Sequence, residues 1–146
     1  AIAHSEVAWV QAPLNAFDQR LVEQGLLEQA HKNGKRVFLR SVFLQGLLMM
    51  TADTLPKPMK FAASQIQEWE TLCTRHDLNA HKAALTFALS SAPNAWIVVG
   101  CETKAQVKKN LEVAQHIMPN KAFLAETRAL STGNTRIINP NTWPIL

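Results

Sequence analysis

The sequence predicts an α/β fold made of three parallel βα units and a C-terminal tail. Three short runs rich in β-branched and aromatic residues, VAWVQ, KRVFL and AWIVVG, are separated by segments with apolar residues at helical spacing. The run KRVFL is continuous rather than alternating, which is typical of a strand buried on both faces in a parallel sheet. Strands that alternate with helices indicate right-handed βαβ units around such a sheet.

The first unit is predicted from the stretch VAWVQAPLN, in which Pro13 and Asn15 end the strand. Asp18 is placed to cap the following helix, because its carboxylate can accept hydrogen bonds from the free amides of the first turn. Gly34 supplies the left-handed stop of this helix. The positions at helical spacing are Leu21, Val22, Gly25, Leu26 and Ala30.

The second unit is expected to contain a helix pair. The stretch TADTLPKP after the second strand is predicted to be a loop, since Pro56 and Pro58 block regular pairing. Of the two helices that follow, the second is capped by Asn79 and ended by Pro93. Their apolar positions are Ala62, Ile66, Trp69 and Leu72 in the first, and Ala83, Ala84, Phe87 and Ala88 in the second.

The third unit starts with AWIVVG, which is predicted to be another buried strand. Thr103 is expected to cap the helix after it, whose apolar stripe is Val107, Leu111 and Ala114. The tail, from Pro119, contains the short helix AFLAETRAL and the irregular end IINPNTWPIL.

Length and composition predict one domain over residues 1–146. The 146 residues include no apolar run approaching the roughly 18 residues of a membrane span. The N-terminus AIAHSEVAWVQ lacks a positive region followed by an apolar one, so we expect no signal peptide. Cys73 and Cys101 are far apart, which favours a reducing, cytoplasmic setting, with a single disulfide as the alternative.

The charge and histidine patterns argue against nucleic-acid binding and against metal binding. The net charge of +4 is scattered, and its closest cluster, Lys104, Lys108 and Lys109, is predicted to be a solvated helix face. Because no nucleic-acid-binding motif accompanies this charge, we expect no nucleic-acid partner. The five histidines do not match metal-ligand spacing, so we expect surface histidines and no metal site.

Polar residues gather where the predicted strands end. In parallel sheets, ligand chemistry collects at the carboxyl ends of the strands. The stretch from Gly100 to Asn110 closes a strand and opens a helix, whose free amides and positive dipole end form a natural phosphate site. The residues predicted at or just after strand ends are Gln11, Arg40, Ser41, Gln45, Gly100, Cys101 and Glu102.

Four stretches of the chain, WVQAPLNAFD, VFLRSVFLQGLL, AALTFALSSAPNAWIVVGCETKAQVKKNLE and INPNTW, resemble the C-terminal part of the aldo-keto reductase family. The resemblance runs over nearly the whole chain in the family's order. It implies a (β/α)8 barrel that binds NADP(H) and reduces aldehydes and ketones, with the sixth to eighth strands present here. Such a barrel needs roughly 250 residues, so the resemblance implies a partial TIM barrel. The missing N-terminal half or a second copy would then be the partner at two exposed sheet edges.

The resemblance also implies roles for individual residues. Gln11 matches a glutamine that contacts the nicotinamide carboxamide. Arg40 stands where the family has a tyrosine that stacks on the nicotinamide, and Ser41 lies near the pyrophosphate. The loop along the pyrophosphate is Leu44, Gln45 and Gly46. The segment that holds the adenosine 2′-phosphate and the adenine ring is Gly100, Cys101, Glu102, Gln106 and Asn110.

Departures from the family pattern limit these expectations. Arg40 can replace the stacking tyrosine, because a guanidinium also stacks on aromatic rings. Glu102 and Gln106 stand where a cation usually binds the 2′-phosphate, so NAD is possible although the family favours NADP; Lys104 or Lys108 would compensate. The chain contains no tyrosine, the family's general acid, and is predicted to be inactive alone. The alternative is a non-catalytic αβ interaction module that self-associates through exposed strand edges.

Overall fold

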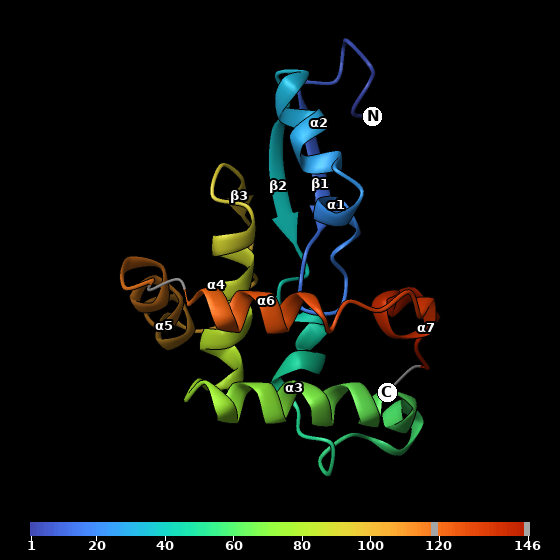
Figure 1. Cartoon of the computed structure of the whole chain (residues 1–146), viewed down its shortest axis with the longest axis vertical. Coiled ribbons are helices and arrows are strands. Elements are labelled where there is room, and N and C mark those ends of the chain that lie inside the picture. The colour runs from blue at the N-terminus through green and yellow to red at the C-terminus, as the bar shows by residue number, and fades with distance from the viewer. Residues whose placement is uncertain (118–119, 145–146) are drawn as a thin grey trace.

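The protein is built on a three-stranded parallel sheet (Figure 1). The computed structural model describes residues 1–117 and 120–144, so the first residue of the predicted tail, Pro119, lies outside the described residues. The strands follow the order β1-β2-β3, with Trp9 opposite Arg36 and Phe38 opposite Trp96. The α/β fold with three parallel strands is therefore confirmed. Their bounds are β1 (Trp9–Pro13), β2 (Arg36–Arg40) and β3 (Trp96–Ile97).

The helices lie around and below this sheet. In Figure 1, α1 and α2 run alongside β1 and β2, whereas α3 and α6 run across the direction of the strands and α5 lies beside α4. None of the helices in the described ranges is long and apolar enough to cross a membrane. The α-helices are α1 (Arg20–Glu23), α2 (Leu26–Lys32), α3 (Ala63–Arg75), α4 (Ala80–Ser91), α5 (Lys104–Gln115), α6 (Lys121–Arg128) and α7 (Thr135–Ile138). The 3-10 helices are η1 (Leu44–Met49), η2 (Lys57–Ala62) and η3 (Pro140–Thr142).

Only one face of the sheet is buried. In β2, the buried Val37 and Leu39 alternate with exposed Arg36, half-buried Phe38 and exposed Arg40. The prediction of a strand buried on both faces is therefore wrong. In a closed barrel the inner face is filled by side chains from strands all around the ring, and three strands cannot supply them.

The third strand is shorter than the stretch AWIVVG predicts. Only Trp96 and Ile97 belong to β3, although the Val98 amide still donates to the Leu39 carbonyl at 2.8 Å. Trp96 is 64% exposed, so the prediction of a buried strand is also wrong. As an edge strand paired with β2 on one side, β3 has one neighbour to hold its ladder in place.

The segment after β1 forms two helices instead of the one predicted. Gly25 has φ of 65° and divides α1 from α2, because this left-handed conformation interrupts a right-handed helix. The expected Asp18 cap is wrong as well. The N-cap of α1 is Gln19 without a side-chain hydrogen bond, whereas Asp18 accepts from Arg20 Nε at 2.8 Å.

Other helix boundaries follow the predicted caps. The Asn79 side chain accepts from the Lys82 amide at the start of α4, and Thr103 caps α5. Helix α6 begins one residue before the predicted stretch AFLAETRAL and ends two residues before the end of that stretch. In the predicted irregular end, α7 and η3 form, and Trp143 Nε1 donates to the Arg136 carbonyl at 2.9 Å; residues 145–146 of this stretch lie outside the described residues.

The apolar stripe of α5 does not face the core. Val107 is 45% exposed and Leu111 is 54% exposed, and Ala114 is exposed too. The spacing correctly indicates a helix with one apolar face, but the described part of the chain leaves this face uncovered.

Candidate functional site

The loop after β2 has an unusual backbone. Ser41, Leu44 and Gln45 have φ of 59°, 47° and 53°, and Gly46 has φ of 85°. For residues with a Cβ atom, each such left-handed conformation costs roughly 1–2 kcal/mol. Conformations of this kind persist only where the surroundings impose them, and they cluster at ligand sites. Arg40, Ser41 and the predicted pyrophosphate loop therefore lie in a segment with an imposed shape.

Buried contacts from two other elements hold this loop. Asn15 is buried at the end of β1, and its Nδ2 donates to the Ser41 carbonyl at 3.1 Å. Trp69, fully buried in α3, donates from Nε1 to the Leu48 carbonyl at 3.0 Å. Leu44 is itself buried. These contacts anchor the loop at the carboxyl end of β2 to the end of β1 and to α3.

Two polar side chains lie on the open face of the sheet. Arg40 is exposed at the end of β2, and its Nη1 donates to Ser41 Oγ at 3.0 Å. Gln11 is exposed in the middle of β1, opposite Phe38, rather than at the strand end as predicted. Because side chains alternate along a strand, Gln11 shares its face with Trp9.

The start of α5 closes on itself through a capping box. The backbone amide of Gln106 donates to Thr103 Oγ1 at 3.2 Å. In return, Gln106 Oε1 accepts from the amides of Glu102 and Thr103 at 2.6 and 3.2 Å. The Glu102 side chain is exposed at this helix start. The predicted adenosine segment therefore includes a helix start whose turn is closed by reciprocal hydrogen bonds.

His81 joins the loop after β2 to the segment after β3. Its ring stacks on Phe43 with centroids 5.2 Å apart, and its Nε2 lies 2.6 Å from Asn110 Oδ1. Asn110 Nδ2 donates in turn to Cys101 Sγ at 3.1 Å. The structure thus brings the two predicted halves of the nucleotide site together, whereas Gln11 lies apart on the sheet face.

The role of His81 is not found by the sequence prediction, which places all histidines on the surface. His81 is 8% exposed, in α4, so this prediction is wrong for it. The helical spacing could have indicated that His81 is buried, because it precedes the core residues Ala84 and Leu85 by three and four positions and shares their helix face.

The cysteines are both free, and only one is near the site. Cys101 is exposed beside Asn110. Cys73 is buried in α3, where burial, assisted by the charge of Glu70, raises the pKa of the thiol to about 12. Cys73 therefore stays protonated and unreactive, and it serves as a core residue. Residues 1–117 and 120–144 contain no cluster of three side chains that could hold a metal ion.

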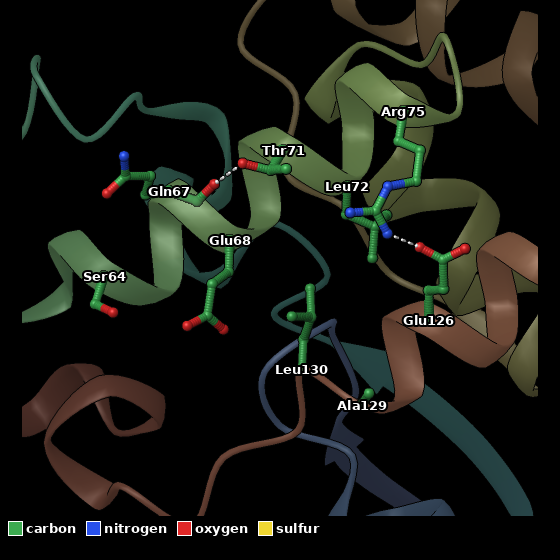
Figure 2. Close-up of a pocket in the computed structure, with 9 residues that line it drawn as sticks. All are labelled: Ser64, Gln67, Glu68, Thr71, Leu72, Arg75, Glu126, Ala129 and Leu130. Carbon is green, nitrogen blue, oxygen red and sulfur yellow. Dashed lines mark hydrogen bonds and ion pairs between the residues drawn. The ribbon is translucent and has the colours of Figure 1, made fainter.

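A cavity of about 520 Å³ lies elsewhere, between α3 and α6 (Figure 2). In Figure 2, the Arg75 guanidinium points at the Glu126 carboxylate, and the two form an ion pair. None of the predicted site residues lines this cavity. Its lining residues are Ser64, Gln67, Glu68, Thr71, Leu72, Arg75, Glu126, Ala129 and Leu130.

A row of aromatic rings crosses the open face of the sheet. Trp9 stacks on Phe38 with centroids 5.2 Å apart, and Phe38 stacks on Trp96 at 6.2 Å. The Arg36 guanidinium lies over the Trp9 ring. Trp9 is 58% exposed, so this row, Trp9–Phe38–Trp96, is the uncovered aromatic surface of the protein.

Three parallel strands with helices on one face correspond to part of a (β/α)8 barrel. The sequence profile of the aldo/keto reductase family matches residues 3–130, and the chain belongs to this family. No curated protein sequence matches the chain.

Solved structures show the same fold at low identity. The aldo-keto reductase AKR11C1 from Bacillus halodurans, in its holo form, is 17% identical and gives a TM-score of 0.67 over 97% of this chain and 48% of its own. Its apo form is 18% identical, with the same TM-score and the same coverage. The glycerol dehydrogenase AKR11B4 from Gluconobacter oxydans is 20% identical, with a TM-score of 0.65 over 95% of this chain and 45% of its own. The chain thus spans about half the length of the structures that it matches.

Proposed function

We propose that this chain carries the nucleotide-binding part of an aldo/keto reductase barrel and binds a nicotinamide adenine dinucleotide. The observation that supports this proposal best is the contact series from Phe43 through His81 and Asn110 to Cys101. It fixes the loop after β2 relative to the start of α5, at the edge of a parallel sheet where ligands bind. A dinucleotide is long enough to need both segments at once.

The residues present fit such a ligand. Arg40 is exposed and planar, so it can stack on the nicotinamide ring, with the Gln11 amide available for the carboxamide on the same open face. The left-handed loop at Leu44, Gln45 and Gly46 has the kind of backbone that forms anion-binding concavities, which suits a pyrophosphate. Gly100, Cys101, Glu102, Gln106 and Asn110 would surround the adenosine.

In this proposal the residues of the chain bind and orient the dinucleotide, and the proton donor comes from the N-terminal half of the barrel. When bound, the nicotinamide would supply the hydride for carbonyl reduction. The family's general acid is a tyrosine, and this sequence contains none. We therefore expect reduction of aldehydes or ketones only when the N-terminal catalytic half of the barrel is present, and no activity from the chain alone.

Cofactor type and location follow from the family in part. The resemblance by itself favours NADP(H), whereas Glu102 is typical of NAD(H) sites. Both cysteines are free, which agrees with the reducing cytoplasm proposed for this protein.

Calorimetric titration of the 146-residue chain with NADH and NADPH tests the proposal. Arg40→Ala removes the stacking group, and stacking of a cation on a ring is worth about 0.5–2 kcal/mol, so affinity should fall roughly 2- to 30-fold. Arg128→Ala, an exposed arginine on α6, is the matched control and should leave affinity unchanged. Absence of binding at millimolar concentrations of both dinucleotides would refute the proposal.

A second candidate function is that of a non-catalytic interaction module. The uncovered aromatic surface favours it, since exposed aromatic patches mark association sites, and β1 and β3 are free sheet edges. The partner would be the N-terminal barrel half or a second copy. Sedimentation velocity should then show a dimer that Trp96→Ser weakens and Met49→Ser, an exposed apolar control, does not. A monomer at all concentrations would rule out self-association.

A further inference from the structure

We propose that a cavity between α4 and α6 binds a small organic anion, with Lys82 and Thr86 holding the anionic group. The cavity has a volume of about 460 Å³, which is within the usual range for small-molecule sites. It lies where α6 packs across α4 (Figure 1). The residues predicted to bind the dinucleotide are all described in the structure, and none of them lines this cavity. The proposal is therefore independent of the dinucleotide site.

Thr86 places an unpaired hydroxyl at the floor of the cavity. It is only 5% exposed, and its Oγ1 makes no hydrogen bond with any described residue. The buried Thr127 of α6, by contrast, donates to the Phe123 carbonyl four residues back at 2.7 Å. A buried hydroxyl without a partner is unfavourable unless a ligand or water satisfies it. Thr86 therefore points to a polar group inside the cavity.

Lys82 supplies a positive charge beside this hydroxyl. Lys82 and Thr86 are four residues apart in α4, so their side chains are neighbours on the helix surface. Lys82 is exposed and forms no salt bridge within residues 1–117 and 120–144. Glu112 and Lys82 both line an adjoining hollow of about 230 Å³, but Glu112 Oε1 lies 3.9 Å from Lys108 Nζ. One anionic group can therefore contact the ammonium group and the hydroxyl together.

Asn120 adds a donor from the other wall, at the start of α6. Its Oδ1 accepts from the amides of Ala122 and Phe123 at 2.9 and 3.3 Å. Because Oδ1 caps the helix in this way, the Nδ2 group remains as a donor. None of the described lining residues carries a carboxylate. An ammonium group, a hydroxyl and an amide N–H without a facing carboxylate suit an anion.

The remaining wall is apolar and aromatic. Phe123 is fully buried, and His76 and Leu78 are partly buried. The His76 ring meets Phe123 edge-on with centroids 5.5 Å apart, and its Nε2 lies 3.2 Å from Glu126 Oε1. This contact fixes the ring as part of the wall. An apolar ring attached to the anionic group would cover this surface, so the ligand class is an aryl phosphate or an aryl carboxylate.

Calorimetric titration of the chain with phenyl phosphate tests the proposal. Phenol and inorganic phosphate are the two halves of this probe, and each should bind at least tenfold more weakly. Lys82→Met should weaken binding of phenyl phosphate at least tenfold, and Thr86→Val, which keeps the shape of the side chain, about 2- to 12-fold. Lys32→Met removes the same charge from an exposed lysine of α2 and is the matched control, with unchanged affinity.

NMR titration of the ¹⁵N-labelled chain locates the probe. The amide resonances of Lys82, Thr86 and Phe123 should shift saturably with phenyl phosphate. Absence of binding at millimolar concentrations overturns the proposal, and so does unchanged affinity in Lys82→Met. Lys82 is exposed, so this variant decides the result even if Thr86→Val fails to fold. Displacement of phenyl phosphate by NADH would place the probe in the dinucleotide site and would also overturn the proposal.

Discussion

His81 provides the sharpest test of how the site is held together. Asn110 Nδ2 points at Cys101 Sγ, so its Oδ1 faces His81 and the His81 Nε2 must carry the proton. A typical hydrogen bond contributes about 0.5–1.5 kcal/mol to stability, and an aromatic stack contributes about 0.5–1.5 kcal/mol more. His81→Ala removes both interactions, so we expect a loss of about 1–3 kcal/mol in the free energy of unfolding.

A second substitution separates the two contributions. His81→Phe keeps a ring against Phe43 but loses the donor to Asn110. It also removes His81 Nδ1, which is buried without a hydrogen-bond partner in the described structure, and this gain offsets part of the loss. We therefore expect His81→Phe to cost less than His81→Ala, at most about 1 kcal/mol.

Urea unfolding followed by circular dichroism measures these values, and a double-mutant cycle with Asn110→Ala isolates the pair. The expected coupling between His81 and Asn110 is about 0.5–1.5 kcal/mol. His4→Phe, on an exposed histidine before β1, is the control and should change stability by less than about 0.5 kcal/mol. Additive effects of His81 and Asn110 would refute the link between the two segments, whatever the size of each single effect.

Three further outcomes follow from single contacts. Hydrogen bonding to Arg75, and secondarily to His76, lowers the pKa of the Glu126 carboxyl below its ordinary 4.5. The stability that this carboxylate contributes should therefore be present above pH 4.5 and lost as pH falls through the lowered pKa. The urea midpoint of Glu126→Gln should lack this loss at acid pH, and identical pH profiles of wild type and variant would contradict the assignment. Thiol labelling with a disulfide reagent should modify Cys101 in the native chain and Cys73 only after unfolding, and rapid double labelling would show that α3 opens readily. Asn79→Ala should cost about 1 kcal/mol in urea unfolding, since it removes the cap of α4, and no loss would mean that water replaces the cap.

Local interactions were the most predictable part of the fold. Asn79 and Thr103 cap the helices that their positions indicate, because a cap depends on the side chain and on amides two or three residues away. Asp18 also has a suitable side chain, but Arg20 takes its carboxylate in a two-residue ion pair. The difference between Asp18 and the other two lies in competition between neighbours, which residue type alone does not reveal.

Burial was less predictable, because it depends on what covers a surface. The continuous run at Val37, Phe38 and Leu39 fits a strand covered on both sides, yet Phe38 stands on a face shared with exposed Trp9 and Trp96. The pattern of a sequence records which residues are apolar and how they are spaced. It does not record whether the partner surface belongs to the same three strands.

In the candidate site, too, the local segments were predictable and the long-range contact between them was not. The left-handed loop at Ser41–Gly46 and the segment Cys101–Asn110 were predicted as binding segments from their position after strands, and the structure shows them to be joined. The joining residue, His81, was missed because its partners are 38 and 29 positions away in sequence and no local pattern connects them.

Some surfaces of this chain are uncovered, whereas the contacts that join the candidate site are made within it. Trp9 and Trp96 on the sheet, and Val107 and Leu111 on α5, are among the exposed large apolar residues of a chain about half as long as the structures it matches. In a closed barrel, surfaces of this kind pack against the remaining strands and helices. The contacts of His81 with Phe43 and Asn110, by contrast, are both made within the chain. The stability of the link through His81 can therefore be measured on this chain, whereas a test of the proposed carbonyl reduction needs a proton donor from outside its tyrosine-free sequence.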